Sequence, residues 1–517
     1  MKKFIKSLMI SLILINVLFI VSCEPGYNNW SSSSSQPMLM EHESMDGDFN
    51  TEEYDIIREN DFRNPWTSPV STFSIDVDNA SYSNMRRFLI MNQLPPKDAI
   101  RIEELVNYFE YDYPEPTGEQ PFSINTELGT CPWNKDNLLL HIGIKGKSLN
   151  YDEIKPGNYV FLVDVSGSMA DESKLSLVKK SLRMMVENLE ASDHIALVVY
   201  AGSAGLVLPS TSLDDKKRIM KAIDHLEAGG STAGGEGIVL AYNEARRNFR
   251  ENGNNRVILA TDGDFNVGIS SSADLIRLIE EERKSGIYLT ICGFGMGNYK
   301  DGRMEQISNA GNGNYFYIDN IREAEKVFSR ELRANLFTIA KDVKIQLEFN
   351  PKQIKSYRLI GYENRLMKKE DFENDQKDAG ELGAGHTVTA LYELVLKNDH
   401  SMPSQDLKFQ SKSLSTNTED ALVHFQLRYK PIKQEESQLI EELLTHEISS
   451  SISENFQFSA AVAGFGMLLR GSAYSGDLDY AEVMAMAKNS NTTASEDRQE
   501  FVSLVKTASL LKENQAR

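Results

Sequence analysis

The stretch from Val160 to Met169, with the sequence VFLVDVSGSM, decides how this 517-residue chain folds. It starts as an apolar run and ends in a glycine-containing turn that carries Asp164, Ser166 and Ser168 at alternate positions. The apolar run predicts a buried strand. Carboxylate and hydroxyl oxygens suit Mg²⁺, which usually keeps several waters when it binds to protein. The stretch therefore predicts a small divalent-cation site at the carboxyl edge of a sheet.

Two later segments carry further oxygen-bearing side chains that suit such a site. Residues 229–235, with the sequence GGSTAGG, form a glycine-rich loop that contains Thr232. Residues 257–263, with the sequence VILATDG, form a second apolar run that ends in Asp262. In their order and spacing, the three segments resemble the metal-ion-dependent adhesion site of von Willebrand factor type A domains.

The resemblance implies a role for each of these side chains. Ser166, Ser168 and Thr232 are expected to contact a Mg²⁺ or Mn²⁺ ion directly or through water. Asp164 and Asp262 are expected to hold the ion mostly through waters. One coordination position then stays open toward solvent, where a carboxylate from a protein ligand replaces water. The ion supplies charge attraction and geometry, and no bond is broken.

The pattern around this site predicts an α/β fold. Strand-like and helix-like segments alternate between about residues 158 and 332, which predicts a doubly wound, mostly parallel sheet with helices on both faces. Ligands bind to such sheets beyond the carboxyl ends of the strands, where the predicted site falls.

The regions before and after this fold each contain a few strand patterns. They lie at 121–129 and 138–145 before it, and at 343–349, 386–396 and 421–429 after it. Two or three strands leave unpaired edges and bury little apolar surface. We therefore expect both groups to share one β-sandwich, with the α/β domain as an insertion. Helical patterns follow at 437–449, 456–469, 480–488 and 496–512.

The predicted organisation has five parts. The flanking regions resemble the von Willebrand-associated N-terminal module and the C-terminal domain found in a group of bacterial lipoproteins of unassigned role. The parts are a lipoprotein signal peptide at 1–22, a disordered acidic and serine-rich stalk at 23–62, an α+β module at 63–155, a von Willebrand factor type A domain at 156–335, and a C-terminal domain at 336–517 that is β-rich (336–431) and then helical (432–513).

The first residues predict export and lipid anchoring. A lysine-containing start is followed by an apolar run from Leu8 to Val21, which is short for a membrane span. The sequence Ser22-Cys23 after that run resembles the bacterial lipobox, which implies that Cys23 carries the lipid. We therefore expect a bacterial cell-envelope protein, anchored to a membrane on its periplasmic or surface face.

The net charge limits which molecules the protein can bind. The 75 acidic and 55 basic residues give a net charge of −20, which argues against binding to nucleic acid because phosphates require Lys and Arg.

Cys131 and Cys292 could pair in an oxidising compartment, but the apolar surroundings of Cys292 favour two unpaired thiols.

Asp76 and Asp78 offer an alternative chemistry. Their spacing after an apolar run matches the paired carboxylates of haloacid-dehalogenase-type phosphatases, in which one attacks a phosphoryl group and the other transfers a proton. A turn or capping role is favoured, because a parallel-sheet context is lacking. The leading hypothesis is thus a non-enzymatic lipoprotein that binds a protein ligand through Mg²⁺. The alternatives are a metal-dependent phosphoester hydrolase using Asp76 and Asp78 or the predicted metal, and a scaffold with a vestigial metal site.

Overall fold

The computed structural model describes residues 52–149, 155–229, 234–263, 272–297, 299–397, 421–445, 451–490 and 495–516. The chain from Phe49 to Arg517 forms one compact unit. Cys23, Thr232 and the predicted signal peptide lie outside the described residues.

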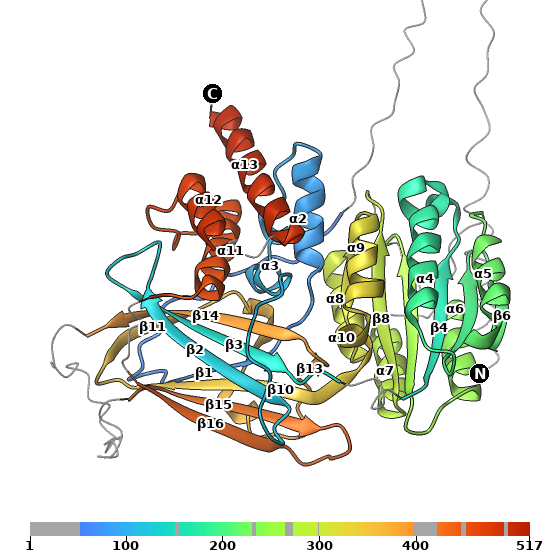
Figure 1. The fold of residues 1–517 in the computed structure, drawn as a ribbon, viewed down its shortest axis with the longest axis horizontal. Coiled ribbons are helices and arrows are strands. Elements are labelled where there is room, and N and C mark those ends of the chain that lie inside the picture. Colours follow the sequence, from blue (N-terminus) through green and yellow to red (C-terminus); the bar gives the residue numbers. More distant parts are fainter. Residues whose placement is uncertain are drawn as a thin grey trace, which may run out of the picture. The chain divides into compact units, whose positions relative to one another are not determined.

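Residues from the middle of the sequence form a mostly parallel β-sheet, as predicted (Figure 1). Among the described residues it has six strands in the order β6-β5-β4-β7-β8-β9. Five of them run parallel, and β6 pairs antiparallel with β5 at one edge. The strands are β4 (Gly157–Asp164), β5 (His194–Tyr200), β6 (Ala204–Ser212), β7 (Asn254–Thr261), β8 (Ile287–Phe294) and β9 (Tyr315–Ile318).

Helices cover both faces of this sheet, which confirms the doubly wound fold. One apolar core joins the sheet to α4, α5, α9 and α10, and a second joins its other face to α6, α7 and α8. The helices are α4 (Leu177–Asn188), α5 (Lys216–Asp224), α6 (Gly234–Arg247), α7 (Ser272–Lys284), α8 (Asp301–Ala310), α9 (Ile321–Glu325) and α10 (Leu332–Leu336).

Strands from before and after this domain pair with each other, as predicted. β3 lies antiparallel to β14, and β1 lies antiparallel to β10. In the described part of the chain, one sheet has the order β11-β14-β3-β2 and the other β12-β1-β10-β15-β16, with β13 added beside β10. A single apolar core contains residues of both sheets. The α/β domain is therefore an insertion into a shared β-sandwich.

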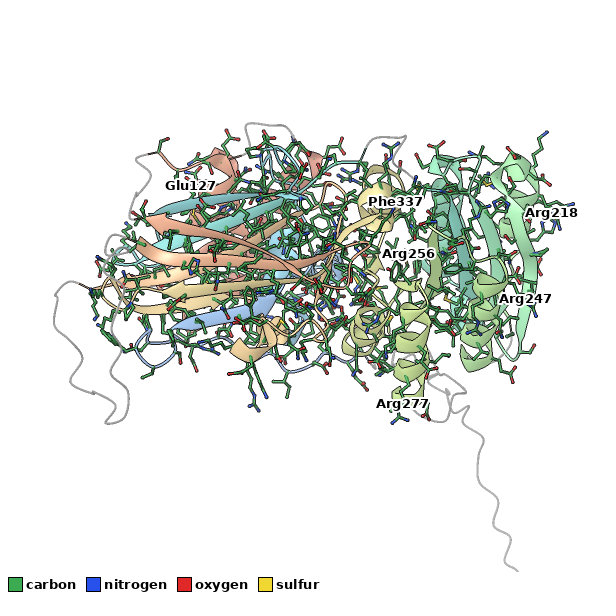
Figure 2. All side chains as sticks on the ribbon, turned by 90° about the horizontal axis from the view of Figure 1, so that it is seen from below. Glu127, Arg218, Arg247, Arg256, Arg277 and Phe337 are labelled. Carbon is green, nitrogen blue, oxygen red and sulfur yellow. The ribbon has the colours of Figure 1, made fainter. Side chains whose placement is uncertain are left out.

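The strands of the sandwich are β1 (Val70–Ser74), β2 (Phe122–Thr130), β3 (Leu138–Gly146), β10 (Thr338–Phe349), β11 (Ile354–Ile360), β12 (Leu366–Met367), β13 (Gly380–Gly383), β14 (Thr387–Leu396), β15 (Ala421–Pro431) and β16 (Gln438–Thr445). Phe337, labelled in Figure 2, ends α10 directly before β10 begins, so the insertion returns to the sandwich without a linker.

Helices from the two ends of the sequence share a third core. It includes side chains of α2 (Ala80–Ile90), α3 (Ile102–Asn107), α11 (Glu454–Arg470), α12 (Tyr480–Asn489) and α13 (Glu496–Ala516). Two glycines of α11 permit this packing. A Cβ at Gly464 would lie 2.6 Å from Leu478, and a Cβ at Gly466 would lie 3.0 Å from Ile102.

One predicted helix is a strand in the structure. We expected a helix at 437–449 within a helical region starting at 432, but residues Gln438–Thr445 form β16 and pair antiparallel with β15. The segment is rich in Leu and Glu, which favour helix. The backbone of β15 needs a partner at this edge, and such pairing overrides local propensity.

The predicted disordered stalk ends earlier than expected. The sequence predicts a stalk at residues 23–62, but residues 52–62 are described and make specific contacts. Glu52 accepts hydrogen bonds from both Nη1 and Nη2 of Arg87, at 2.7 and 2.8 Å. The Asn60 amide donates to the backbone oxygens of Leu359 and Gly361. Partners distant in sequence therefore order an acidic segment whose composition alone predicts disorder.

A buried arginine joins the α/β domain to the helices of the third core. Arg86 of α2 donates from Nε to Asp319, which follows β9, at 2.9 Å, and from Nη2 to Glu323 of α9 at 2.7 Å. It also donates to the Tyr108 hydroxyl at 2.8 Å and to Glu500 of α13 at 3.1 Å. Its side chain is only 2% exposed. Four segments thus meet at one guanidinium group.

Candidate metal site at the carboxyl edge of the sheet

The turn after β4 brings three of the predicted side chains together. Asp164 is the last residue of β4, and its Oδ1 accepts a hydrogen bond from the Ser166 amide at 2.9 Å. The Ser166 and Ser168 hydroxyl oxygens lie 3.0 Å apart. Ser166 is buried, whereas Ser168 is exposed. The cluster therefore starts inside the domain and opens toward solvent.

Asp262 reaches the same edge from the neighbouring strand. β7 lies beside β4, with Val163 paired to Ala260, so the residues that follow each pair meet at the carboxyl edge. Asp262 is fully buried. The structure thus brings together four of the five predicted residues. The fifth, Thr232, lies outside the described residues, although the Gly229 amide at the start of its loop donates to the Val165 oxygen at 2.7 Å.

Two buried carboxylates at this edge fit a cation. Within the described ranges, Asp262 Oδ1 is buried and has no hydrogen-bond partner, and the Asp164 carboxylate is fully buried beside it. An unsatisfied buried carboxylate oxygen is costly, and a metal ion removes that cost. Burial raises the pKa of Asp164 to about 6, the charge of Asp262 adds to the increase, and hydrogen bonds from Ser166 and Tyr200 oppose it. The donor set of carboxylates and hydroxyls therefore suits Mg²⁺ or Mn²⁺.

Lys174 also lies at this site, which the sequence did not indicate. It belongs to the π-helical turn Glu172–Ser176 before α4, and its Nζ lies 2.9 Å from Asp262 Oδ2. Its methylene groups lie against Gly295, where a Cβ would be 2.4 Å from Lys174 Cε. Because Lys174 and Asp262 are 88 residues apart, no local pattern connects them.

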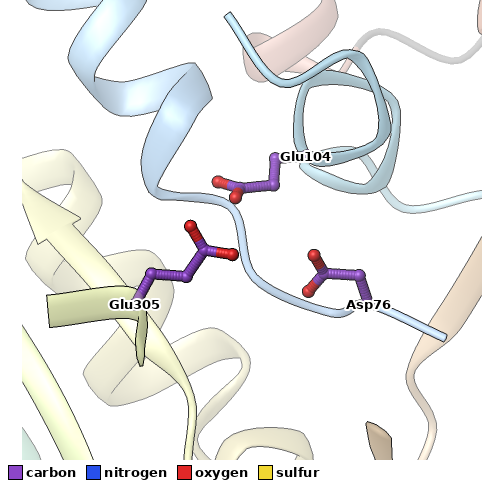
Figure 3. A group of neighbouring side chains, drawn as sticks. All are labelled: Asp76, Glu104 and Glu305. Carbon is purple, nitrogen blue, oxygen red and sulfur yellow. The ribbon is translucent and has the colours of Figure 1, made fainter. Parts of the chain in front are cut away.

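A second group of carboxylates occurs where the sandwich meets α8. Asp76, Glu104 and Glu305 each offer one oxygen within 4.8 Å of the others (Figure 3). However, each already has a basic or amide partner. Arg365 binds Asp76 at 2.8 Å, Arg101 binds Glu104, and an amide donates to Glu305 at 2.5 Å. Guanidinium groups therefore supply the positive charge that a metal ion would bring.

Asp76 and Asp78 make structural contacts. The Asp78 amide donates to Asp76 Oδ1 at 3.0 Å, which is a turn stabilised by a side chain. Arg365 donates to both carboxylates, and Asp78 also accepts a hydrogen bond from the Tyr315 amide at 2.8 Å. Burial raises the pKa of Asp78 to about 8. These contacts favour the turn role and argue against a nucleophile, because the arginine holds both carboxylates.

The remaining sequence predictions concern cysteines. Cys131 and Cys292 are both buried and unpaired, as predicted. Burial raises the pKa of each thiol, so both remain neutral packing residues.

Comparison with known proteins covers nearly the whole described chain. Residues 158–330 match the von Willebrand factor type A domain family, and residues 48–141 match a family described as von Willebrand factor. Residues 334–511 match the C-terminal domain of the uncharacterized protein YfbK. The YfbK protein of Escherichia coli K12 is 41% identical over 468 residues, which cover 89% of this chain and 81% of the relative. The chain belongs to the YfbK family.

Other matches to this YfbK family member are partial. The uncharacterized protein sll0103 of Synechocystis is 28% identical over 190 residues, covering 37% of this chain and 44% of the relative. Among solved structures, a von Willebrand factor type A protein from Catenulispora acidiphila is 15% identical, covers 76% of this chain and 91% of its own, and has a TM-score of 0.42. In the ranges that the structure describes, no helix combines the length and apolar character that crossing a membrane requires.

Proposed function

We propose that this protein binds a protein ligand through a divalent-cation site formed by Asp164, Ser166, Ser168, Thr232 and Asp262. The observation that carries the proposal is the pair of buried carboxylates of Asp164 and Asp262 beside the exposed Ser168, with Asp262 Oδ1 lacking a hydrogen-bond partner among the residues that the structure describes. Mg²⁺ is the expected ion, with Mn²⁺ as a substitute, because all the proposed ligands are oxygens.

In this proposal the role of each side chain depends on how deeply it is buried. The buried carboxylates of Asp164 and Asp262 supply negative charge, and the Ser166 amide fixes the orientation of Asp164 through its hydrogen bond. The exposed Ser168 lies on the solvent side. A bound ion would supply positive charge and a coordination position for an acidic side chain of the ligand. The protein is then an adhesion or scaffold protein without catalytic activity.

We expect binding of envelope proteins to require both the ion and Ser168. Immobilised full-length protein is incubated with cell-envelope extract in Mg²⁺ and, separately, in a chelator. The wild type should retain proteins only in Mg²⁺, and Ser168→Ala should lose them because one hydroxyl ligand is gone. Ser192→Ala is the control, since Ser192 precedes β5 at the opposite edge of the sheet. Retention of the same proteins in chelator would contradict a metal-dependent site.

We further propose that Cys23 carries a lipid that anchors the protein to a bacterial envelope membrane. The support is the apolar leader that ends in Ser22-Cys23. An acidic protein would be repelled by anionic lipid headgroups, and acyl chains overcome that repulsion.

Cys23→Ser is expected to release the protein from the membrane fraction or leave it unprocessed. Cells are labelled with a radioactive or clickable fatty acid, and the protein is followed through membrane fractionation. Cys131→Ser serves as the control, because Cys131 is a buried thiol in the folded unit. Acyl label that persists in Cys23→Ser would show that the lipid is attached elsewhere.

A further inference from the structure

The Lys174 ammonium group lies inside the proposed metal site. Its Nζ contacts Asp262 Oδ2 at 2.9 Å, and its side chain is 12% exposed while that of Asp262 is fully buried. This pairing satisfies only one oxygen of Asp262, because Asp262 Oδ1 has no partner in the described part of the chain. The lysine therefore neutralises one of two buried carboxylates and leaves an oxygen of Asp262 for another cation.

The local backbone makes room for this lysine. Gly295 follows β8 with a φ of +75°, a conformation that side chains disfavour. A Cβ at this position would meet the Cε, Cγ and Cδ atoms of Lys174 at 2.4, 2.6 and 2.9 Å. The loop after β8 and the turn before α4 thus enclose the lysine stem. This enclosure places the ammonium group next to Asp262.

The charges at the site decide how an incoming ion interacts with Lys174. Two carboxylates balance one divalent ion, whereas the same pair with an ammonium group already present leaves an excess positive charge after the ion binds. Repulsion between cations in a partly buried site is strong, because the effective dielectric constant is low. A divalent ion can therefore coordinate Asp262 only if the Lys174 ammonium group moves away from Asp262 or contacts the same carboxylate together with the ion.

We propose that Lys174 is a built-in counter-cation that competes with the divalent ion for Asp262. It stabilises the carboxylate pair when no ion is bound and lowers the affinity for the ion. Binding of the ion displaces the ammonium group from Asp262, which loosens the contact between the turn before α4 and the loop at Gly295. This inference rests on the proposed function of the site.

Titration calorimetry of the full chain with MgCl₂ tests this competition. Lys174→Met keeps the methylene packing and removes the charge, so its Kd should fall by about tenfold or more. Lys174→Arg keeps the charge and should bind like the wild type. Lys180→Met removes an equal charge from an exposed position of α4 and should change the Kd little.

Thermal unfolding gives a second readout. In chelator, Lys174→Met should have a lower melting temperature than the wild type, because two buried carboxylates repel each other. On addition of Mg²⁺, its melting temperature should rise more than that of the wild type. A purely structural lysine would lower both melting temperatures equally. If Lys174→Met does not fold, Lys174→Gln replaces it in both measurements.

The outcomes separate this inference from the proposed function. Binding by the wild type with an equal or weaker affinity in Lys174→Met overturns the competition and leaves the metal site intact. Binding by Lys174→Met alone supports the competition strongly. Absence of Mg²⁺ binding in the wild type and in every variant overturns both.

Discussion

Replacement of Asp164 by alanine is expected to abolish divalent-ion binding and to change the free energy of unfolding in chelator by no more than about 1 kcal/mol. Asp164 is fully buried at the end of β4. The variant loses the hydrogen bonds that Asp164 makes with the Ser166 amide and with Tyr200, but it also loses the desolvation cost of a buried carboxylate and the repulsion with Asp262. Calorimetric titration with Mg²⁺ or Mn²⁺ measures the first effect, and denaturant unfolding in chelator measures the second.

Asp193 provides a matched control for this experiment. It is a buried aspartate before β5, and it accepts hydrogen bonds from the amides of Gly157 and Glu190 at the amino edge of the sheet. Asp193→Ala should lower stability and leave the affinity for Mg²⁺ unchanged. The assignment of Asp164 is wrong if Asp164→Ala binds Mg²⁺ as tightly as the wild type.

Arg86→Met is expected to lower the free energy of unfolding by about 3–5 kcal/mol, the usual cost of removing one partner from a buried ion pair. The guanidinium group is 2% exposed and contacts Asp319 and Glu323, whose side chains are 5% and 0% exposed. Without it these carboxylates remain buried beside each other and lose the guanidinium group that pairs with both of them. Denaturant unfolding at neutral pH measures the loss.

The exposed pair of Arg183 and Asp224 serves as the comparison. Their side chains are 40% and 53% exposed, and Nη1 lies 2.7 Å from Oδ1. Arg183→Met should cost less than about 1 kcal/mol, because solvent screens such pairs. Similar losses in the two variants would mean that Arg86 does not hold the α/β domain to its neighbours.

The α/β domain could be predicted because its signals are local. The apolar runs before Asp164 and Asp262 each form one strand, and the helices between them follow from short-range periodicity. The shared sandwich could also be predicted, since too few strands on either side leave unpaired edges. β16 could not, because its pairing with β15 decides its structure.

Lys174, the part of the candidate site that the sequence does not predict, could not be found for a similar reason. The oxygen ligands follow a short motif, but Lys174 meets Asp262 across 88 residues, and Arg86 meets Asp319 across 233. A charged side chain in a helical pattern predicts a solvated surface unless its partner is known. Only the three-dimensional arrangement brings these charges together, so the lysine and the buried arginines became apparent only with the fold.

Glu52 connects α2 to the loop that lies beside the proposed ion. Its Oε1 accepts a hydrogen bond from the Gly297 amide at 3.0 Å, and Arg87 donates hydrogen bonds to both of its carboxylate oxygens. Gly297 belongs to the loop that also carries Gly295 beside Lys174. A movement of Glu52 would therefore be passed directly to α2 and to the loop beside the proposed ion.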